Sequence, residues 1–282
     1  MKKFVRGIVI LCLVLAVSAN LAVAAPESQQ KFIYSNGVYL QTVPTKLEGK
    51  ITLAGKTSRA LLKILVLKDE TQRWYDVELE DGVFNEEIWF IDGTGEYQVS
   101  VLVHKDGRVY SFGPTVFIEN TTEVNRFLVP TLHVESNSEE VMTLAEEITK
   151  DSKTDIEKAK KIYDWVATNI TYDYGKYIMQ LNNNYDNDYG ALKTLGTLTG
   201  VCYDYSTLLA ALGRAAGLQV KVVKGYYRSP LRSELHAWNE IYISEQDRWI
   251  NVDSTFGSSA LEKSSYFDSY NFYTNHEKLE EY

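Results

Sequence analysis

The sequence predicts an α+β protein in which an all-β domain precedes a domain of helices and antiparallel strands. From Lys31 to about Leu128, apolar residues alternate and turn signals recur about every ten residues. This spacing is typical of short antiparallel strands. After Pro130, apolar residues recur instead at the helical period of 3.6 residues. An apolar N-terminal segment comes before both parts.

The N-terminal segment has the pattern of a secretory signal peptide. Basic residues precede an apolar run, and the small residues Ala22-Val23-Ala24 follow it, which predicts a signal peptide over 1–24 with cleavage after Ala24. The alternative is an uncleaved membrane anchor, because 4–25 is nearly long enough to span a bilayer. Ser18 and Asn20 interrupt that run. We therefore expect a secreted, cell-surface or cell-wall protein without a stable membrane span.

Charge and cysteine content restrict the possible partners. Removing 1–24 takes away three positive charges, which changes the formal net charge from −9 to −12, and it leaves Cys202 as the only cysteine. No intramolecular disulfide is then possible, so the thiol is either free and reactive or paired between molecules. The acidic balance argues against a nucleic-acid partner, because no basic stripe is present to neutralise phosphates.

Residues 25–130 predict seven or eight short strands, the pattern of an immunoglobulin-like β-sandwich. The segment Lys105-Asp106-Gly107-Arg108 between Val103 and Val109 predicts a hairpin with a type I′ turn. The polar positions of this domain carry no recognisable chemistry, so we expect a spacer or adhesive module. Trp74 and Trp89 are expected to be core residues.

Residues 131–282 begin with two helix signals. Ser136 to Glu139 fits a capping box before a helix that runs through Lys150, and Thr154 to Glu157 fits another. The second helix is expected to bury one apolar face, formed by Ile156, Ala159, Tyr163, Val166 and Ile170.

The Asn- and Tyr-rich segment 174–187 is expected to be a solvated surface loop. Its neighbouring acidic residues suggest a calcium loop, but Tyr189 stands where such a loop needs Gly and Leu195 where it needs Glu. The sequence therefore predicts no calcium site here.

Cys202 is expected in the first turn of a helix. Gly200 permits a tight turn before it, apolar residues follow at helical spacing, and Gly217 supplies a stop signal. Free backbone N–H groups and the helix dipole stabilise a thiolate at such a position. The alternative is a small buried apolar residue, which is what many lone cysteines are.

Three predicted strands follow this helix. They comprise 220–226, 236–243 and 248–253, so His236 begins the second strand and Asp253 ends the third. Cysteine, histidine and aspartate can together supply a nucleophile, a base and a carboxylate that orients the imidazole.

The register of the last two strands decides whether such a triad can form. A five-residue loop would pair Ile243 with Trp249 and send Asp253 to the face opposite His236. A four-residue loop, Ser244 to Asp247, pairs Ile243 with Arg248 and puts Asp253 diagonal to His236 on one face. The catalytic interpretation thus requires an even loop or a bulge.

The other candidate sites are weaker. His104, His133 and His276 each stand alone in the sequence, and one cysteine with scattered histidines does not supply the ligands of a zinc site. Ser206 lies a turn inside the helix, and no Gly-x-Ser-x-Gly elbow surrounds it. We therefore expect no metal and no cofactor.

Three blocks resemble, in order, the motifs of the transglutaminase-like (papain-fold) superfamily: "GVCYDYSTLLAALGRAAGL", "HAWNEIYI" and "RWINVDSTFG". The upstream "AKKIYDWVATNITYD" is similar to that family's lead-in helix. The resemblance implies a papain-like fold with Cys202 as nucleophile, His236 as base and Asp253 as the orienting acid. Tyr172 is then a candidate oxyanion donor beside the Cys202 backbone N–H, and Trp238 a candidate for lining the site.

The expected activity is acyl transfer through a thioester on protein or peptide amide bonds. An amine acceptor would give a transglutaminase, whereas water would give a deamidase or protease, and the motifs do not choose among them. Surface protein or cell-wall peptide is the expected substrate. The alternative is a non-catalytic binding or assembly module at the cell surface. The sequence predicts no oligomeric state.

Overall fold

A computed structural model describes residues 31–185, 188–230, 233–259 and 266–282 of the chain. Phe32 to Tyr282 form one compact unit. The predicted signal peptide and its cleavage site lie outside the described residues. Among the helices that are described, none is both long and apolar enough to cross a membrane.

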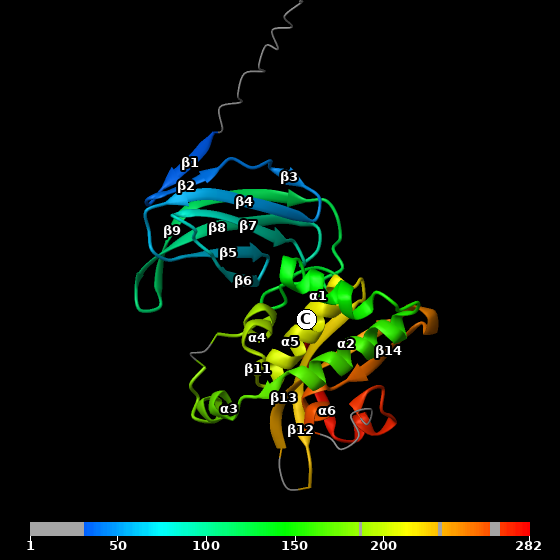
Figure 1. The fold of residues 1–282 in the computed structure, drawn as a ribbon. Helices are drawn as coiled ribbons and strands as arrows, with labels where there is room; N and C mark the ends of the chain where they lie inside the picture. The colour runs from blue at the N-terminus through cyan, green and yellow to red at the C-terminus, as the bar shows by residue number, and fades with distance from the viewer. Residues whose placement is uncertain (1–30, 186–187, 231–232, 260–265) are drawn as a thin grey trace, which may run out of the picture. The chain divides into compact units, whose positions relative to one another are not determined.

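Two sheets with mostly antiparallel strands make up the N-terminal half (Figure 1). One sheet has the strand order β1-β2-β4-β7 and the other the order β3-β9-β8-β5-β6. The strands are β1 (Phe32–Ser35), β2 (Val38–Gln41), β3 (Lys46–Leu47), β4 (Lys50–Thr57), β5 (Leu62–Lys68), β6 (Thr71–Asp76), β7 (Val83–Trp89), β8 (Gly95–Asp106) and β9 (Val109–Asn120).

These two sheets share one apolar core. Val38 and Leu53 from the first sheet and Ile64, Val101 and Ile118 from the second belong to a single buried cluster. In β2 and β4, buried residues alternate with more exposed ones, as the period-two pattern predicts. The sequence thus predicted the strand-rich character of this half, and its immunoglobulin-like assignment stays a prediction.

The predicted hairpin between β8 and β9 is present, with Asp106 paired to Val109. Its turn type is a correction. Gly107 has a positive φ of 52°. Arg108 is not among the described non-glycine residues that have a positive φ. A type I′ turn needs positive φ at both central residues, so the two-residue loop is not of that type.

The C-terminal half combines helices with a four-stranded sheet of order β14-β13-β12-β15. Its elements are α1 (Glu139–Thr149), α2 (Asp155–Asn169), β10 (Thr171–Tyr172), α3 (Tyr174–Leu181), α4 (Ala191–Thr197), β11 (Thr199–Gly200), α5 (Cys202–Ala215), β12 (Val220–Arg228), β13 (Ser233–Ile243), η1 (Ser244–Gln246), β14 (Arg248–Val252), α6 (Ser254–Ser259), η3 (Tyr270–Thr274) and β15 (His276–Glu281).

The register that the catalytic interpretation requires is the one observed. Ile243 pairs with Arg248, and Asn239 pairs with Val252. The connection is the four-residue loop, in which η1 is followed by Asp247 in the left-handed conformation. Because side chains alternate along a strand, this register brings Asp253 to the face that carries His236.

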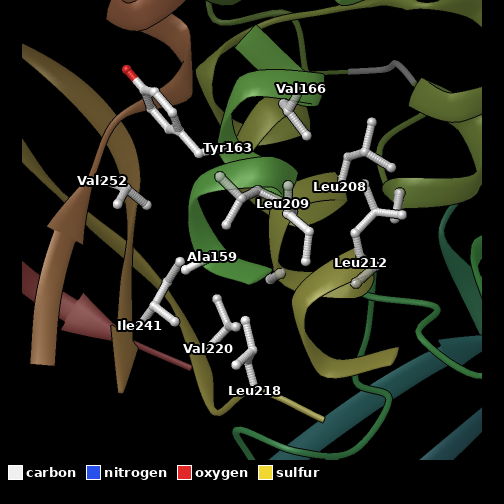
Figure 2. Close-up of a cluster of buried hydrophobic side chains, with 14 of the residues drawn as sticks. Ala159, Tyr163, Val166, Leu208, Leu209, Leu212, Leu218, Val220, Ile241 and Val252 are labelled. Carbon is white, nitrogen blue, oxygen red and sulfur yellow. The ribbon is translucent and has the colours of Figure 1, made fainter. Parts of the chain in front are cut away.

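Helix α5 is the centre of the second half. It packs against α1, α2 and α4 and against strands β12 and β13. Figure 2 shows Leu208, Leu209 and Leu212 of α5 meeting Ala159 and Val166 of α2. Strand residues complete this core: Val220, Ile241 and Val252. A helix surrounded in this way is apolar on nearly all faces.

The predicted helix starts are largely confirmed. Thr154 caps α2, its side chain accepting a hydrogen bond from the Glu157 N–H at 3.3 Å. The first helix begins two residues later than predicted, because Ser138, and not Ser136, accepts from the Val141 N–H. The predicted apolar face of α2 is buried except at Ile156, which is partly buried.

Segment 174–187 was wrongly predicted as a loop over its first half, which forms α3. Asp173 caps this helix by accepting from the Lys176 N–H at 2.9 Å. No residue of α3 is fully buried, so the polar composition that indicated a loop reflects an exposed helix. Residues 186–187 lie outside the described part.

Gly225 allows β15 to approach β12 at a register shift beside His236. A Cβ at Gly225 would lie 2.0 Å from the Glu277 carbonyl oxygen and 2.6 Å from the Trp238 ring. We therefore expect Gly225→Ala to lower the free energy of unfolding by about 1–3 kcal/mol. Gly196→Ala, in α4 with no atom within 4 Å of the added Cβ, should leave it equal or higher. Urea unfolding followed by tryptophan fluorescence measures both, and equal stability of the two variants would refute the expectation.

Candidate active site

Cys202 is the first residue of α5, as predicted, and it is partly exposed. The Val201 N–H donates to the Asp204 carboxylate at 2.9 Å, which closes the first turn of the helix. The Cys202 N–H belongs to the first turn, whose N–H groups have no intrahelical acceptor. The thiol therefore lies next to backbone N–H groups that have no acceptor within the helix.

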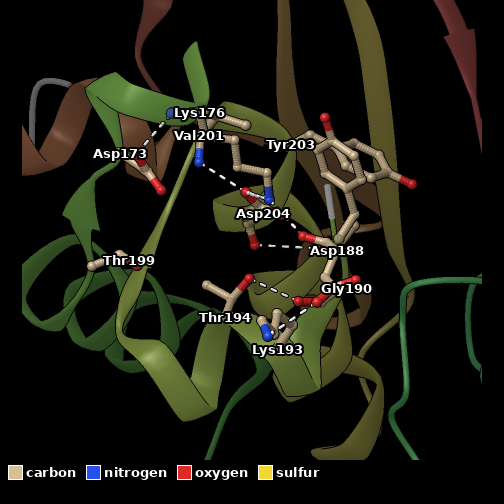
Figure 3. A network of polar contacts seen from close by, with 12 residues as sticks. Asp173, Lys176, Asp188, Gly190, Lys193, Thr194, Thr199, Val201, Tyr203 and Asp204 are labelled. Atoms are coloured by element: carbon tan, nitrogen blue, oxygen red, sulfur yellow. Dashed lines mark hydrogen bonds and ion pairs between the residues drawn. The ribbon is translucent and has the colours of Figure 1, made fainter. Parts of the chain in front are cut away.

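A buried ion pair holds this turn in place. Lys176 of α3 donates to Asp204 at 2.8 Å, and Figure 3 shows the two side chains meeting beside Val201. Burial raises the pKa of Asp204, while the Lys176 ammonium and the Val201 N–H act in the opposite direction. Lys176 also donates to the Asp188 carbonyl oxygen at 2.7 Å. One ammonium group thus ties α3 and the segment before α4 to the start of α5.

The start of α5 is also fixed to the sheet. The Asn239 side-chain amide on β13 donates to the Ser206 carbonyl oxygen at 2.9 Å. The Ser206 hydroxyl in turn donates to the Cys202 carbonyl oxygen at 2.8 Å. These contacts set the spacing between α5 and the strand that carries His236.

His236 and Asp253 form a buried hydrogen-bonded pair, with Nε2 of the imidazole 2.7 Å from Oδ2 of the carboxylate. Burial lowers the pKa of His236, but the charge and hydrogen bond of Asp253, together with those of Cys202, outweigh burial and raise it. For Asp253, burial raises the pKa, and the charge and hydrogen bond of His236 reverse this and hold it well below its ordinary value. The pair is therefore stable as imidazolium and carboxylate.

Cys202 and His236 interact through the other side of the ring. Cys202 raises the pKa of His236 through a hydrogen bond and through charge. Because Nε2 is bonded to Asp253, Nδ1 is the ring nitrogen left for the thiol. The structure thus brings together the three residues that the sequence selected, in the order sulfur, imidazole, carboxylate.

Tyr172 and Trp238 occupy different positions around these three residues. Tyr172 pairs with Gly200 in the short β10–β11 ladder, and burial, then the charge of Cys202, raise the pKa of its hydroxyl. Its hydroxyl therefore stays protonated. Trp238 is buried, with its ring stacked beside His236 at a centroid distance of 6.3 Å. Neither Tyr172 nor Trp238 is among the residues that line the cleft described next.

A cleft of about 530 Å³ opens beside the thiol. Both Cys202 and His236 line it, together with tyrosines, leucines and a few charged side chains. His133, which the sequence left as an isolated linker residue, is one of the lining residues and lies 3.0 Å from the Tyr203 hydroxyl. His104 lies in the β half at the predicted hairpin. Its Nε2 is 3.0 Å from the Gly107 carbonyl oxygen.

His276, which the sequence predicts only as an isolated residue, also joins the site. It is buried, and its Nε2 lies 3.3 Å from Oδ2 of Asp253. It reaches this place because β15 returns along β12 and pairs His276 with Tyr227. The polar sequence around His276 has no period that would indicate a strand beside a buried site. Gly225 lets the backbone of β15 come close to β12 at this point, because a Cβ there would lie 2.0 Å from the Glu277 carbonyl oxygen.

His236, Asp253 and His276 are the described residues whose ligand atoms lie close enough to hold a metal ion, all within 4.8 Å of one another. A metal bound there would have to replace the 2.7 Å hydrogen bond between His236 and Asp253. The donor pattern fits a hydrogen-bonded triad better than a metal site.

Comparison with known proteins agrees with this geometry. Residues 142–254 match the Transglutaminase-like superfamily, and all three residues of the sulfur, imidazole and carboxylate series fall in that range. The chain is 28% identical over 138 residues to the uncharacterized protein YebA of Bacillus subtilis, and 28% identical over 127 residues to kyphoscoliosis peptidase of Homo sapiens. The matches cover 44% and 42% of this chain and 18% of each relative.

A solved structure of a proposed cysteine protease from Cytophaga hutchinsonii aligns over 89% of this chain and 84% of its own. The two sequences are 19% identical and the TM-score is 0.43. The three sequence blocks all begin within residues 142–254, the region of the chain that matches the transglutaminase-like superfamily.

Proposed function

We propose that the protein is a thiol acyl-transfer enzyme that acts on protein or peptide amide bonds with Cys202, His236 and Asp253 as its triad. The observation that carries this proposal is the buried imidazole of His236, held at 2.7 Å by a buried carboxylate and interacting with a thiol at the start of α5. A nucleophile beside a base that a third group orients is the arrangement of covalent catalysis.

In the first half-reaction, the Cys202 thiolate attacks the carbonyl carbon of the amide and forms a tetrahedral intermediate. His236 donates its proton to the leaving nitrogen, the C–N bond breaks, and ammonia or an amine departs. A thioester then remains on Cys202, and His236 is neutral.

In the second half-reaction, neutral His236 takes a proton from water or an amine that attacks the thioester carbonyl. The C–S bond breaks, the thiolate of Cys202 returns, and the proton stays on His236. Water gives hydrolysis or deamidation, and an amine gives cross-linking. Asp253 stabilises the imidazolium in both halves and fixes which nitrogen faces the thiol.

Two donors are available for the oxyanion of the tetrahedral intermediate. The Cys202 backbone N–H belongs to the first turn of α5, where N–H groups lack intrahelical acceptors. The Tyr172 hydroxyl is protonated because burial and the charge of Cys202 raise its pKa. Donors of this kind stabilise charge that develops only in the transition state.

The cleft supports a peptide substrate with an apolar side chain near the reacting carbonyl. Leu181, Tyr185 and Leu235 line it and are all largely exposed, Leu235 by 66%. Exposed apolar side chains gathered beside a nucleophile are typical of a binding surface. A surface protein or cell-wall peptide is the proposed partner.

The remaining proposals concern the whole chain. We propose export by a signal peptide over 1–24, an immunoglobulin-like β-sandwich over 25–130 and a catalytic domain over 131–282. The two separate apolar cores support such a division. The alternative function is a binding or assembly module that has kept the fold without turnover, and the substitutions described next distinguish the two.

Removing each triad residue should have unequal effects. Cys202→Ala should abolish formation of a trapped thioester. His236→Ala should lower the rate of thioester formation almost as much, because the proton donor to the leaving nitrogen is lost. Asp253→Asn should retain activity about 100-fold above that of Cys202→Ala. Turnover of a peptide amide and mass spectrometry of the acyl-enzyme measure this, with His104→Ala as the control. If Cys202→Ala kept wild-type turnover, the proposed function would be wrong.

The buried pair should also give stability a defined pH dependence. His236 has a raised pKa, so its contribution is complete below its ordinary value of 6.5 and is lost as the pH rises through the raised value. Asp253 has a lowered pKa, so its contribution is complete above its ordinary value of 3.8 and is lost as the pH falls through the lowered value. The melting temperature of the wild type should therefore exceed that of Asp253→Asn most between these two pH values.

The control for this pH series is Asp151→Asn, which changes an exposed carboxylate after α1. Its melting temperature should follow that of the wild type at every pH. A constant difference between the wild type and Asp253→Asn from pH 3 to 10 would contradict the ionised pair.

Substrate binding in the cleft can be tested with two exposed leucines of the same sheet. Leu235→Ser removes an apolar lining residue and should raise KM for a peptide with an apolar side chain about tenfold, with kcat unchanged. Leu279→Ser alters a leucine on β15 that is 56% exposed and is not a lining residue of the cleft, so it should leave KM as it is. Equal KM values in both variants would argue against the apolar subsite.

A further inference from the structure

We propose that His276 is a positioning residue that holds the Asp253 carboxylate against His236. This inference rests on the proposed triad, and it extends the triad to a fourth residue from the C-terminal strand. Nε2 of His276 lies 3.3 Å from Oδ2 of Asp253, the same oxygen that His236 contacts at 2.7 Å.

The direction of this hydrogen bond follows from the state of the carboxylate. An ionised carboxylate has no proton to donate, so the bond runs from the Nε2–H of His276 to Asp253. Oδ1 of Asp253 accepts from the Phe256 N–H at 3.0 Å. The carboxylate thus has one donor on Oδ1 and two on Oδ2, which fixes its orientation toward His236.

The His276 ring is itself held on its other edge and on its face. Nδ1 lies 3.1 Å from the Phe272 carbonyl oxygen and 2.7 Å from Oδ1 of Asn275. The ring stacks on Phe272 at a centroid distance of 3.7 Å and an angle of 13°, and Trp238 meets it edge-on at 5.1 Å. A side chain locked by packing can in turn orient a catalytic group.

The groups that influence this carboxylate come from several elements. His236 and His276 bond to it, and the hydrogen bonds and charges of both act to lower its pKa. Tyr163 of α2 and Tyr266 interact with it through charge, and Cys202 acts on it through His236. Removing the His276 donor should therefore weaken Asp253 as the partner of the imidazolium, and weaken the imidazolium as the partner of the Cys202 sulfur.

The test uses two substitutions of His276 in the full chain. His276→Phe keeps an aromatic ring against Phe272 and Trp238 but loses the N–H donor. His276→Gln loses the ring but places an amide donor near the position of Nε2. His104→Phe, a change at the exposed hairpin of the β half, is the matched control. For each protein we would measure melting temperature, kcat and KM for a peptide amide, and the rate of Cys202 alkylation by iodoacetamide against pH.

The positioning role predicts that His276→Phe lowers kcat about tenfold with little change in KM. Its alkylation profile should move to higher pH, and His276→Gln should recover most of both properties. If His276→Phe has wild-type kcat and a wild-type alkylation profile, the inference is overturned. The same holds if the Gln and Phe variants lose activity only in proportion to their loss of melting temperature.

Failure of this inference can be distinguished from failure of the proposed function. If Cys202→Ala abolishes turnover and His276→Phe does not change it, the triad stands and His276 has only a packing role. If Cys202→Ala leaves turnover unchanged, the proposed function falls as well. Alkylation against pH requires no substrate, so it reports on the His276 contact in either case.

Discussion

The buried contact between His236 and Asp253 is the constraint on which the rest of the site depends. A carboxylate removed from water costs several kcal/mol unless charges and donors surround it. Asp253 has such surroundings: two imidazoles and a backbone N–H meet its two oxygens. Three separate segments have to converge at this carboxylate, namely strand β13, strand β15 and the β14–α6 junction that carries Asp253 itself. The geometry of the sheet therefore decides whether the pair exists.

The loop between β13 and β14 controls that geometry. Four residues connect Ile243 to Arg248, and an even number keeps Asp253 on the face of His236. One residue more or fewer would turn the carboxylate to the other face of the sheet, where it would be buried without its partner. Gly225 has a similar role on the other side, because only a residue without a Cβ lets β15 come within reach of β12 at that point.

Helix α5 both forms part of the apolar core and carries the candidate nucleophile. Its body is buried against helices and strands and forms much of the core, while its first residue is the partly exposed Cys202. The core thereby fixes the position of the sulfur. The contacts of Asp204 with Lys176 and of Asn239 with Ser206 fix the first turn in the remaining directions. A thiol so placed requires little reorganisation when it attacks a carbonyl.

The sequence by itself determined the order of elements around the site. Helix spacing placed Cys202 at a helix start, and strand alternation placed His236 and Asp253 on neighbouring strands, because these periods are local properties of the chain. Strand register also predicted that the His236–Asp253 pair requires an even loop or a bulge, and the structure has a loop of four residues. It could not place His276 or His133, since both join the site through contacts between residues far apart in the chain, and it mistook the exposed helix α3 for a loop. Only tertiary structure decides such contacts, because a polar segment shows no apolar period until another strand covers it.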